Sequence, residues 1–410
     1  MPAQGRLTNC LAHPSSLLLH SLSFIQLKQM KRIFFTALIV TSISSFAQQD
    51  TSQLDAVEVR ATRASKTAPF TKTNISGKEL QKNNLGQDIP FLLNQTPSVV
   101  INSDAGNGVG YTGMRIRGSD NTRINVTLNG IPYNDAESHG SYFVDLPDLA
   151  SSVNSIQIQR GVGTSSNGPG AFGASLSIST NEIRKDAYAE FNNAYGSFNT
   201  WKNTIRAGSG LLNDHFTVDA RLSRISSDGF IDRASSNLKA VYLSTAYLAN
   251  HSSLRFNLIK GSEKTYQAWN GILKEDLRFS RTANSAGTAK PGEPYDNETD
   301  NYDQDHYQFF FNQEFNERLS FNTAVFLTRG KGYYEQYKAE ERYDTYGLPP
   351  FIAGGDPLTT TDLVRQLWLD NYYYGNVFSF NYKQNKTQLT LGGAYTRYDG
   401  SHYGKITWAQ

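Results

Sequence analysis

The sequence predicts an all-β transmembrane barrel of antiparallel strands that follows a smaller α+β domain. Beyond Ile183 the chain alternates apolar and polar residues over long stretches, which is typical of strands with one apolar and one polar face. The connections between these stretches are short at one end and long at the other. Mean hydropathy is only -0.49 although 12% of the residues are aromatic. A barrel in lipid tolerates such a composition, whereas a helical membrane protein does not.

The N-terminus is typical of an export signal with an upstream extension. Met30 to Arg32 supplies a basic region, Ile33 to Val40 an apolar stretch too short to span a bilayer, and Ser45 to Ala47 a cleavage site. Residues 1–29 fit no part of such a signal. We interpret them as the result of a start codon assigned too far upstream. The alternative is a structured extension. We therefore expect residues 1–47 to be removed, with the signal at about residues 30–47.

Removal of residues 1–47 changes the charge and the cysteine content. It leaves 35 of the 39 basic residues against 37 acidic ones, so the formal net charge of +2 becomes -2. No basic surplus for nucleic-acid binding remains. The cut also removes Cys10, the only cysteine. The mature chain is then expected to contain no disulfide and no cysteine-based metal site.

The first half of the α+β domain is predicted to contain two short helices. Ser76 and Glu79 have the spacing of a capping box, which opens a helix that runs to about Asn83. Asp88 and Pro90 open a second helix, which carries Phe91, Leu92 and Leu93 toward the core.

Short strands follow, and glycines interrupt them. Gly118 and Gly130 each end a β-patterned segment, and Asp145 to Pro147 opens one helical turn before the next strand. The predicted strands are Val99 to Asn102, Met114 to Arg117, Arg123 to Asn129, Val153 to Arg160 and Ala174 to Thr180.

This glycine-punctuated pattern resembles the plug domain of TonB-dependent outer-membrane receptors, the gated transporters of Gram-negative bacteria. Arg117-Gly118 stands where the family has the motif IRG, Asn129 to Pro132 where it has DGVP, and Ile158 to Gly161 where it has EVLRG. The resemblance extends from about Leu54 to Thr180. It implies structural roles for Arg117, Gly118, Gly130, Arg160, Gly161 and Gly173. Family members usually carry Glu where this chain has Asn154 and Gln157, so the ion pairs of those acids are not expected here.

The resemblance also implies the organisation of the chain. Residues 48–70 are expected to be a flexible periplasmic segment with a TonB box, residues 71–182 the plug, and residues 183–410 the N-terminal part of the barrel. The box consists of Leu54, Asp55, Ala56, Val57, Glu58 and Val59. An extended segment of this kind adds a strand to a partner's sheet edge through main-chain hydrogen bonds. The alternative is an ordinary first strand of the plug sheet.

The barrel prediction depends on alternation and on loop lengths. Phe216 to Ser223, Leu254 to Leu258 and Leu319 to Leu327 alternate between apolar and polar residues. We predict tight turns at Leu211 to Asp214 and at Asn316 to Arg318, and long connections at about residues 262–302 and 337–362. A soluble β-sandwich has similar alternation but short connections at both ends, whereas a barrel combines short periplasmic turns with long outer loops.

About nine strands are predicted before Gln410, whereas plugged barrels have about 22. Nine strands alone leave unpaired edges in lipid. The expectation is therefore that the sequence contains the N-terminal part of a longer barrel.

The family resemblance implies a ligand site on the apical loops of the plug. Residues 102–111, 119–121 and 133–143 match these loops by position. The ligand-binding candidates are Tyr111, Ser119, Asp120, Asn121, Tyr133, Asn134, Asp135, His139 and Tyr142. Aromatic walls with a few polar groups suit a bulky chelate, although packing against the barrel wall explains any single one of these residues equally well. Trp269 is predicted either to cover the ligand or to anchor at the membrane interface.

Catalytic signals are weak, so no enzymatic activity and no cofactor are expected. Gly168 to Gly173 matches G-x-G-x-x-G, but a strand and not a helix is predicted to follow. The acidic run from Glu293 to Asp305 is a calcium candidate, with a solvated outer loop as the favoured interpretation.

The resemblance implies TonB, outer-membrane lipid and a small nutrient as partners. The nutrient is most often an iron chelate in this family, with cobalamin and oligosaccharides next. The alternative class is a barrel enzyme or adhesin that does not import.

Overall fold

The computed structural model describes residues 63–64, 68–163 and 170–410. The predicted export signal, the predicted TonB box at Leu54 to Val59, and the first residues of the Gly168 to Gly173 motif lie outside these ranges. Within them, no helix has the length and apolar character that crossing a membrane requires.

The described part of the α+β domain contains a five-stranded sheet in the order β1-β6-β7-β4-β5. Only β4 and β7 are parallel neighbours; the other pairs are antiparallel. The strands are β1 (Lys72–Ser76), β4 (Ile124–Leu128), β5 (Ile131–Pro132), β6 (Ser155–Arg160) and β7 (Ala174–Ser179). A separate hairpin pairs β2 (Val99–Ser103) with β3 (Thr112–Ile116). The predicted strands are therefore confirmed, each shifted by one or two residues at its ends.

The first predicted helix is confirmed as α2 (Gly77–Asn83), with the capping box at its start. The Ser76 hydroxyl accepts from the Glu79 amide at 3.3 Å, and the Glu79 carboxylate accepts from the Ser76 amide at 2.8 Å. Two unpaired amides at the helix start are satisfied in this way. A Cβ on Gly77 would lie 2.5 Å from the Val153 carbonyl oxygen. Only glycine therefore fits at this position, where the start of the helix packs against Val153.

The second predicted helix is confirmed as α3 (Ile89–Leu92), but Asp88 does not cap it. The Asp88 carboxyl makes no capping hydrogen bond and instead accepts from the Thr112 hydroxyl at 3.0 Å. Burial raises the pKa of Asp88 to about 8; the Thr112 hydrogen bond opposes this shift and the neighbouring Asp148 adds to it. A carboxyl with that pKa is mostly protonated near neutral pH, so Asp88 is a neutral hydrogen-bonding group and not a charged helix cap.

The helical turn predicted to open at Asp145 to Pro147 is found as the 3-10 turn η4 (Leu149–Ser152), directly before Val153. A second 3-10 turn, η3 (Phe143–Asp145), precedes it. Asp148 separates them with a left-handed φ of 52°. Asp is one of the few residues that adopts this conformation readily.

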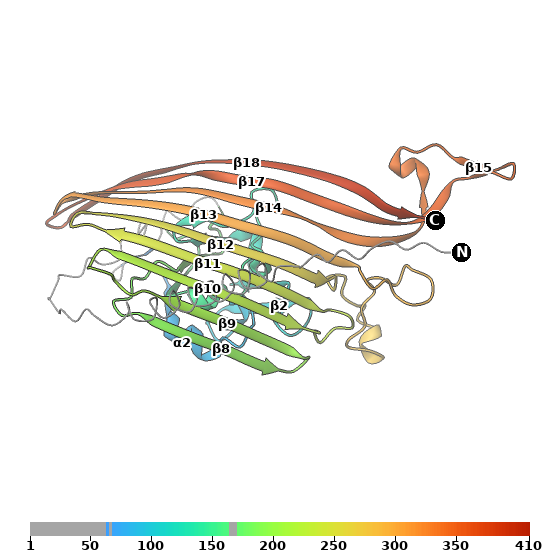
Figure 1. Ribbon diagram of the computed structural model, residues 1–410, viewed down its shortest axis with the longest axis horizontal. Helices are drawn as coiled ribbons and strands as arrows, with labels where there is room; N and C mark the ends of the chain where they lie inside the picture. Colours follow the sequence, from blue (N-terminus) through green and yellow to red (C-terminus); the bar gives the residue numbers. More distant parts are fainter. Residues whose placement is uncertain (1–62, 65–67, 164–169) are drawn as a thin grey trace, which may run out of the picture. The chain divides into compact units, whose positions relative to one another are not determined.

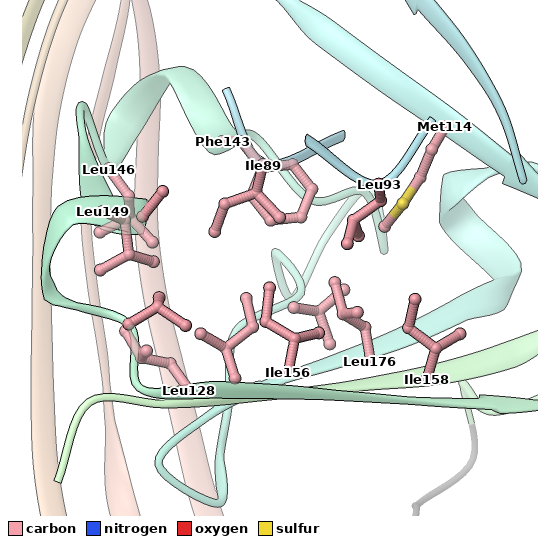
Figure 2. Packing of buried hydrophobic residues seen from close by; sticks show 14 of the residues in the cluster. Ile89, Leu93, Met114, Leu128, Phe143, Leu146, Leu149, Ile156, Ile158 and Leu176 are labelled. Carbon is pink, nitrogen blue, oxygen red and sulfur yellow. The ribbon is translucent and has the colours of Figure 1, made fainter. Parts of the chain in front are cut away.

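The α+β core lies between the sheet and the short helices. Figure 2 shows Ile156, Ile158 and Leu176 from the sheet facing Leu93 and Ile89 from the segments above it. Ile156, Ile158, Leu176 and Leu93 have no measurable exposure. Each such side chain contributes about 1.5–3 kcal/mol on burial, so this cluster holds the small domain together.

The turn after β4 is a two-residue hairpin. Asn129 and Gly130 both have positive φ, 58° and 84°, and Leu128 pairs with Ile131 across them. This is the type I′ geometry that Asn-Gly favours. Gly173 has a different role, because a Cβ there would lie 2.3 Å from the Cβ of Ser119. The remaining predicted structural glycines, Gly118 and Gly161, have φ of 81° and 90°.

The described chain beyond the α+β domain forms one antiparallel sheet of nine strands, as Figure 1 shows. Neighbours in the sheet are also neighbours in sequence, apart from a small hairpin, β15 (Phe351–Ala353) with β16 (Asp356–Leu358), between β14 and β17. The nine strands are β8 (Tyr188–Gly196), β9 (Thr200–Gly208), β10 (Phe216–Ser227), β11 (Ser236–Leu248), β12 (Ser252–Tyr266), β13 (Thr299–Asn316), β14 (Leu319–Arg342), β17 (Thr360–Gln384) and β18 (Thr387–Ala409).

The polarity of this sheet is inverted relative to a water-soluble protein. In β10, Thr217 and Arg221 are 1% exposed, whereas Leu222 is 58% exposed. β12 repeats the pattern, with Asn257 buried and Leu254 exposed. The polar side chains therefore face the α+β domain and the apolar ones face away from it, as the alternation predicted for a barrel wall.

The connections are asymmetric, as predicted, but the strands are longer than expected. β12 runs to Tyr266 and β13 begins at Thr299, so that long connection is residues 267–298. β14 runs to Arg342 and β17 begins at Thr360, so the second is residues 343–359. At the opposite end of the sheet, residues 249–251, 317–318 and 385–386 are short turns.

Candidate functional site

A pocket of about 1120 Å³ lies between the α+β domain and the nine-stranded sheet. Its lining comes from the loop after β5, from the connection after β12, and from β13, β14, β17 and β18. The aromatic residues that line it are Tyr111, Tyr133, Tyr142, Trp269, Tyr302, Tyr333, Tyr334, Trp368, Tyr373, Tyr398 and Tyr403. This volume suits a ligand larger than most drug-sized molecules.

One wall of the pocket is a series of rings that passes from the α+β domain to the sheet. Tyr111 contacts Trp269 edge to face at 5.9 Å between ring centres, and Trp269 contacts Tyr334 in the same way at 5.9 Å. Tyr111 also lies 6.4 Å from Tyr142. Of the two roles predicted for Trp269, the structure supports a position over the pocket, since the ring lines it.

A second aromatic group lies on the sheet itself. Trp368 of β17 stacks on Tyr403 of β18 at 5.9 Å and 5°, and its ring centre is 4.6 Å from that of Tyr333 in β14. Sequence reasoning missed all three residues. The available signal was the high density of aromatic residues in β14, β17 and β18.

The loop after β5 is built by its own polar side chains. The Asn134 amide accepts from the Val126 amide at 2.7 Å and donates to the carbonyl oxygens of Ile124 and His139, each at 2.9 Å. One Asp135 oxygen accepts from both the amide and the hydroxyl of Ser138 at 2.7 Å. Asn134 and Asp135 line the pocket, but these contacts give them a structural task in the loop.

Glu137 ties this loop to the last strand of the sheet. Its carboxylate accepts from the Tyr398 hydroxyl at 2.8 Å and lies 2.7 Å from Nε2 of His402. Both partners belong to β18 and line the pocket. Glu137 falls within the predicted apical loop 133–143, but these partners lie more than 250 residues away in sequence, so no local pattern indicated the contact.

The predicted ligand residues separate into two groups. Tyr111, Tyr133, Asn134, Asp135 and Tyr142 line the pocket. Ser119, Asp120, Asn121 and His139 are not part of its lining.

Local contacts account for two members of the second group. Asp120 caps the 3-10 turn η2 (Asn121–Arg123), accepting from the Thr122 amide at 3.1 Å, and pairs with Arg123 at 3.0 Å. His139 has a left-handed φ of 60°, and its carbonyl accepts from Asn134.

The calcium candidate receives no support from the geometry. In the described ranges, no group of three or more His, Cys, Asp or Glu side chains is arranged to hold a metal ion. Asp300, Asp303 and Asp305 belong to β13 and are paired in register with β12, and Asp305 forms an ion pair with Lys260 at 2.8 Å. The run is therefore partly strand rather than a solvated loop.

A comparison with protein families identifies the α+β domain. Residues 64–175 match the family model described as the TonB-dependent Receptor Plug Domain. The chain carries a TonB-dependent receptor plug. No curated protein matches the chain at a significant level.

Solved structures share the fold of plug and sheet together. The ferric-catecholate import receptor Fiu from E. coli K12, in its open form, matches with a TM-score of 0.59 and 17% identity over 82% of this chain and 50% of its own. BauA, the ferric preacinetobactin receptor from Acinetobacter baumannii, gives 0.60 and 14% over 82% and 48%. The ferric citrate transporter FecA gives 0.55 and 16% over 82% and 49%. The chain thus spans about half the length of these receptors.

The plug is joined to the sheet by a buried ionic network at Asp148. Its carboxylate lies 2.9 Å from the Lys202 ammonium and accepts from the hydroxyls of Thr204 and Ser223 at 2.6 and 2.7 Å. The Asp148 carbonyl accepts from the Arg221 guanidinium. Burial alone would raise the pKa of Asp148, but the charges of Arg221 and Lys202 outweigh burial and hold the pKa at about 2.

The two positions where the family usually carries Glu have different partners here. The Gln157 amide accepts from the Ala64 amide at 2.7 Å and donates to the Ala64 carbonyl at 3.1 Å. Asn154 donates to Glu182 at a long 3.5 Å. Gln157 therefore binds the backbone of the segment that enters the plug. Arg160, a predicted structural residue, donates to the Thr73 hydroxyl at 2.8 Å and joins β6 to β1.

Proposed function

We propose that this protein is a TonB-dependent outer-membrane receptor that imports a scarce nutrient, with an iron chelate as the cargo. The observation that carries this proposal is the aromatic pocket of about 1120 Å³ between the plug and the sheet. Cargo in this pocket contacts the plug loops and the sheet at once, so the plug can respond to its binding. Fiu, BauA and FecA are described as handling ferric chelates, which supports iron as the cargo, although another matching structure is described as the copper transporter OprC.

We assign the parts of the chain accordingly. Residues 1–47 are the upstream extension and signal, and residues 48–70 are the periplasmic segment with the TonB box at Leu54 to Val59. Residues 71–182 are the plug and residues 183–410 are barrel. The exposed apolar face of the sheet, including Leu222 and Phe191 at 58% and 71% exposure, suits outer-membrane lipid. TonB is the partner that supplies work from the inner membrane.

Transport is tested by uptake in cells with and without TonB. We expect accumulation of radiolabelled ferric chelate only in cells that have TonB, and stronger receptor expression under iron limitation. Uptake that is independent of TonB would instead favour a barrel enzyme or adhesin. Import of cobalamin or an oligosaccharide, with no iron import, would overturn the iron assignment and keep the transporter.

The Val57→Pro variant tests energy coupling in the same cells. Proline removes a backbone donor and fixes φ, so it disrupts an added strand. We expect uptake to collapse while binding of the chelate to whole cells changes by less than about threefold, which is under about 1 kcal/mol. Equal loss of binding and uptake would mean that residues 54–59 are structural.

A further inference from the structure

The floor of the pocket is acidic, and its acids have no ionic partner in the described chain. Asp145 of the plug and Asp300 of β13 line the pocket and are 6% and 9% exposed. Glu263 of β12, 4% exposed, contacts the same Tyr111 hydroxyl as Asp300. None of the three belongs to an ion pair among the described residues, and no Lys or Arg is part of the pocket lining there.

Tyr111 joins two of these acids. Its hydroxyl lies 2.6 Å from Asp300 Oδ2 and 3.1 Å from Glu263 Oε1. A hydroxyl has one proton to donate, so Tyr111 satisfies one carboxylate oxygen at a time. Burial, followed by the charges of Glu263, Asp300 and Asp145, raises the pKa of Tyr111 well above its usual range. The ring that begins the aromatic wall thus lies among three buried acids.

Asp145 is the acid with the fewest partners. One of its oxygens accepts from the Gln304 amide at a long 3.3 Å. The other oxygen has no hydrogen bond to any described residue, although the side chain is more than nine-tenths buried and borders the pocket. Burial, followed by the charge of Asp300, raises the pKa of Asp145 well above its usual value. A buried carboxylate needs a charged or hydrogen-bonding partner, and the pocket is the open side from which one can arrive.

The aromatic walls suit the same kind of partner. The faces of Tyr and Trp rings attract cations within about 6 Å of the ring centre. The chain already provides an example at the rim, where the Lys405 ammonium lies 4.4 Å from the ring centre of Trp368 and 5.5 Å from that of Tyr403. Aromatic faces and buried acids in the same pocket both favour a positively charged group.

We propose that the cargo carries a positively charged group, of ammonium or guanidinium type, that enters the pocket and pairs with Asp145 on its floor. This inference rests on the proposed function, because it assigns the charge of the cargo to the same site. It also means that a multiply anionic chelate is rejected, since its charge would face acids without an intervening cation.

The test compares ferric chelates that differ in charge. The probes are a ferric trihydroxamate with a pendant ammonium, the same chelate with that amine acetylated, and a multiply anionic ferric tricatecholate. Binding to the protein purified in detergent is measured by titration calorimetry. We expect the ammonium chelate to bind about tenfold more tightly than its acetylated form, which corresponds to about 1.4 kcal/mol, and the tricatecholate to bind most weakly. Equal affinities, or tightest binding of the tricatecholate, would overturn the inference.

Two variants locate the effect. Asp145→Asn keeps the shape of the side chain and should abolish the preference for the ammonium form. Asp120→Asn removes a plug carboxylate that is outside the pocket lining and should leave the preference unchanged. A preference that survives Asp145→Asn would show that another group selects the charge and would overturn the assignment to the floor.

Failure of the iron assignment remains distinguishable from failure of the charge inference. If none of the ferric chelates binds, the iron cargo is wrong, and the charge preference is then decided with a metal-free pair, benzyltrimethylammonium and benzenesulfonate. Binding of the cation alone, abolished by Asp145→Asn, supports the inference without iron. Binding of neither probe, or of the sulfonate, overturns it.

Discussion

Asp145 and Asp148 lie three residues apart on one plug segment and have opposite environments. Asp148 is surrounded by Lys202, Arg221 and hydroxyl donors, which hold its pKa at about 2. Asp145 lies among other acids, and its pKa is raised. Both are buried. Asp148, with cations around it, joins the plug to the sheet. Asp145, without cations, lowers the stability of the fold, which points to a role in binding.

The largest effect on the free energy of unfolding should come from Asp148. Asp148→Asn leaves Lys202 and Arg221 buried without a negative partner, which costs about 3–5 kcal/mol. The measurement is the free energy of unfolding of the refolded protein in detergent. Since the folded pKa is depressed, this contribution is complete above about pH 4 and is lost as the pH falls through about 2. A loss under about 1 kcal/mol would contradict the role of this network.

A third acid, Asp88, extends the comparison through its pH dependence. Its pKa rises to about 8 on burial, so folding favours its protonated form. The contribution of protonated Asp88 to the free energy of unfolding is complete below about pH 4. It falls by about 1.4 kcal/mol per pH unit as the pH rises toward 8. Asp88→Asn should remove that slope between pH 5 and 8, measured as the free energy of unfolding. Identical slopes in variant and wild type would show that Asp88 ionises freely; Asp120→Asn, at an exposed acid, is the matched control.

The contact between pocket floor and wall can be tested at Gly261 of β12. A Cβ at this position would lie 2.0 Å from the carbonyl oxygen of Asp145, a backbone atom that cannot rotate away. Gly261→Ala should therefore cost about 1–3 kcal/mol through overpacking. Gly404→Ala, in β18, is the matched control, because the nearest atom to its added Cβ is a Leu367 methyl carbon at 3.4 Å. Equal stability of the two variants would mean that the plug does not press on the wall at Asp145.

The smallest effect is expected at an ion pair on the surface. Arg184 and Glu190 are 2.7 Å apart, with side chains 35% and 38% exposed. Glu190→Gln should change the free energy of unfolding by less than about 1 kcal/mol, since solvent already screens the charges. A loss as large as that of Asp148→Asn would mean that burial is not what distinguishes the fastening network.

Much of the fold was predictable because it depends on local signals. The Ser76 capping box, the Asn129-Gly130 hairpin and the alternation around Arg221 are each visible over a few residues. Strand ends were underestimated, because β12 and β14 continue past the apolar-polar alternation into polar sequence. Hydrogen bonding to a neighbouring strand, and not hydropathy, decides where such a strand ends.

The site was predictable only where it lies on the plug. Tyr111, Tyr133 and Tyr142 follow from the family position of the apical loops. Trp368 and Tyr403 lie directly opposite each other on the neighbouring strands β17 and β18, so it is the register of this strand pair that brings them together. The opposite environments of Asp145 and Asp148 were also invisible, because Lys202, which lies beside Asp148, and Asp300, which lies near Asp145, come from different strands.

The central claim is that Asp145 binds the cargo while Asp148 holds the plug to the sheet. Thermal unfolding with and without the ammonium-bearing ferric trihydroxamate tests this claim most directly. Asp145→Asn should melt at or above the wild-type temperature and lose the upward shift that the chelate produces. Asp148→Asn should melt well below the wild type without chelate. A destabilised Asp145→Asn that still shows the full chelate-induced shift would contradict the account.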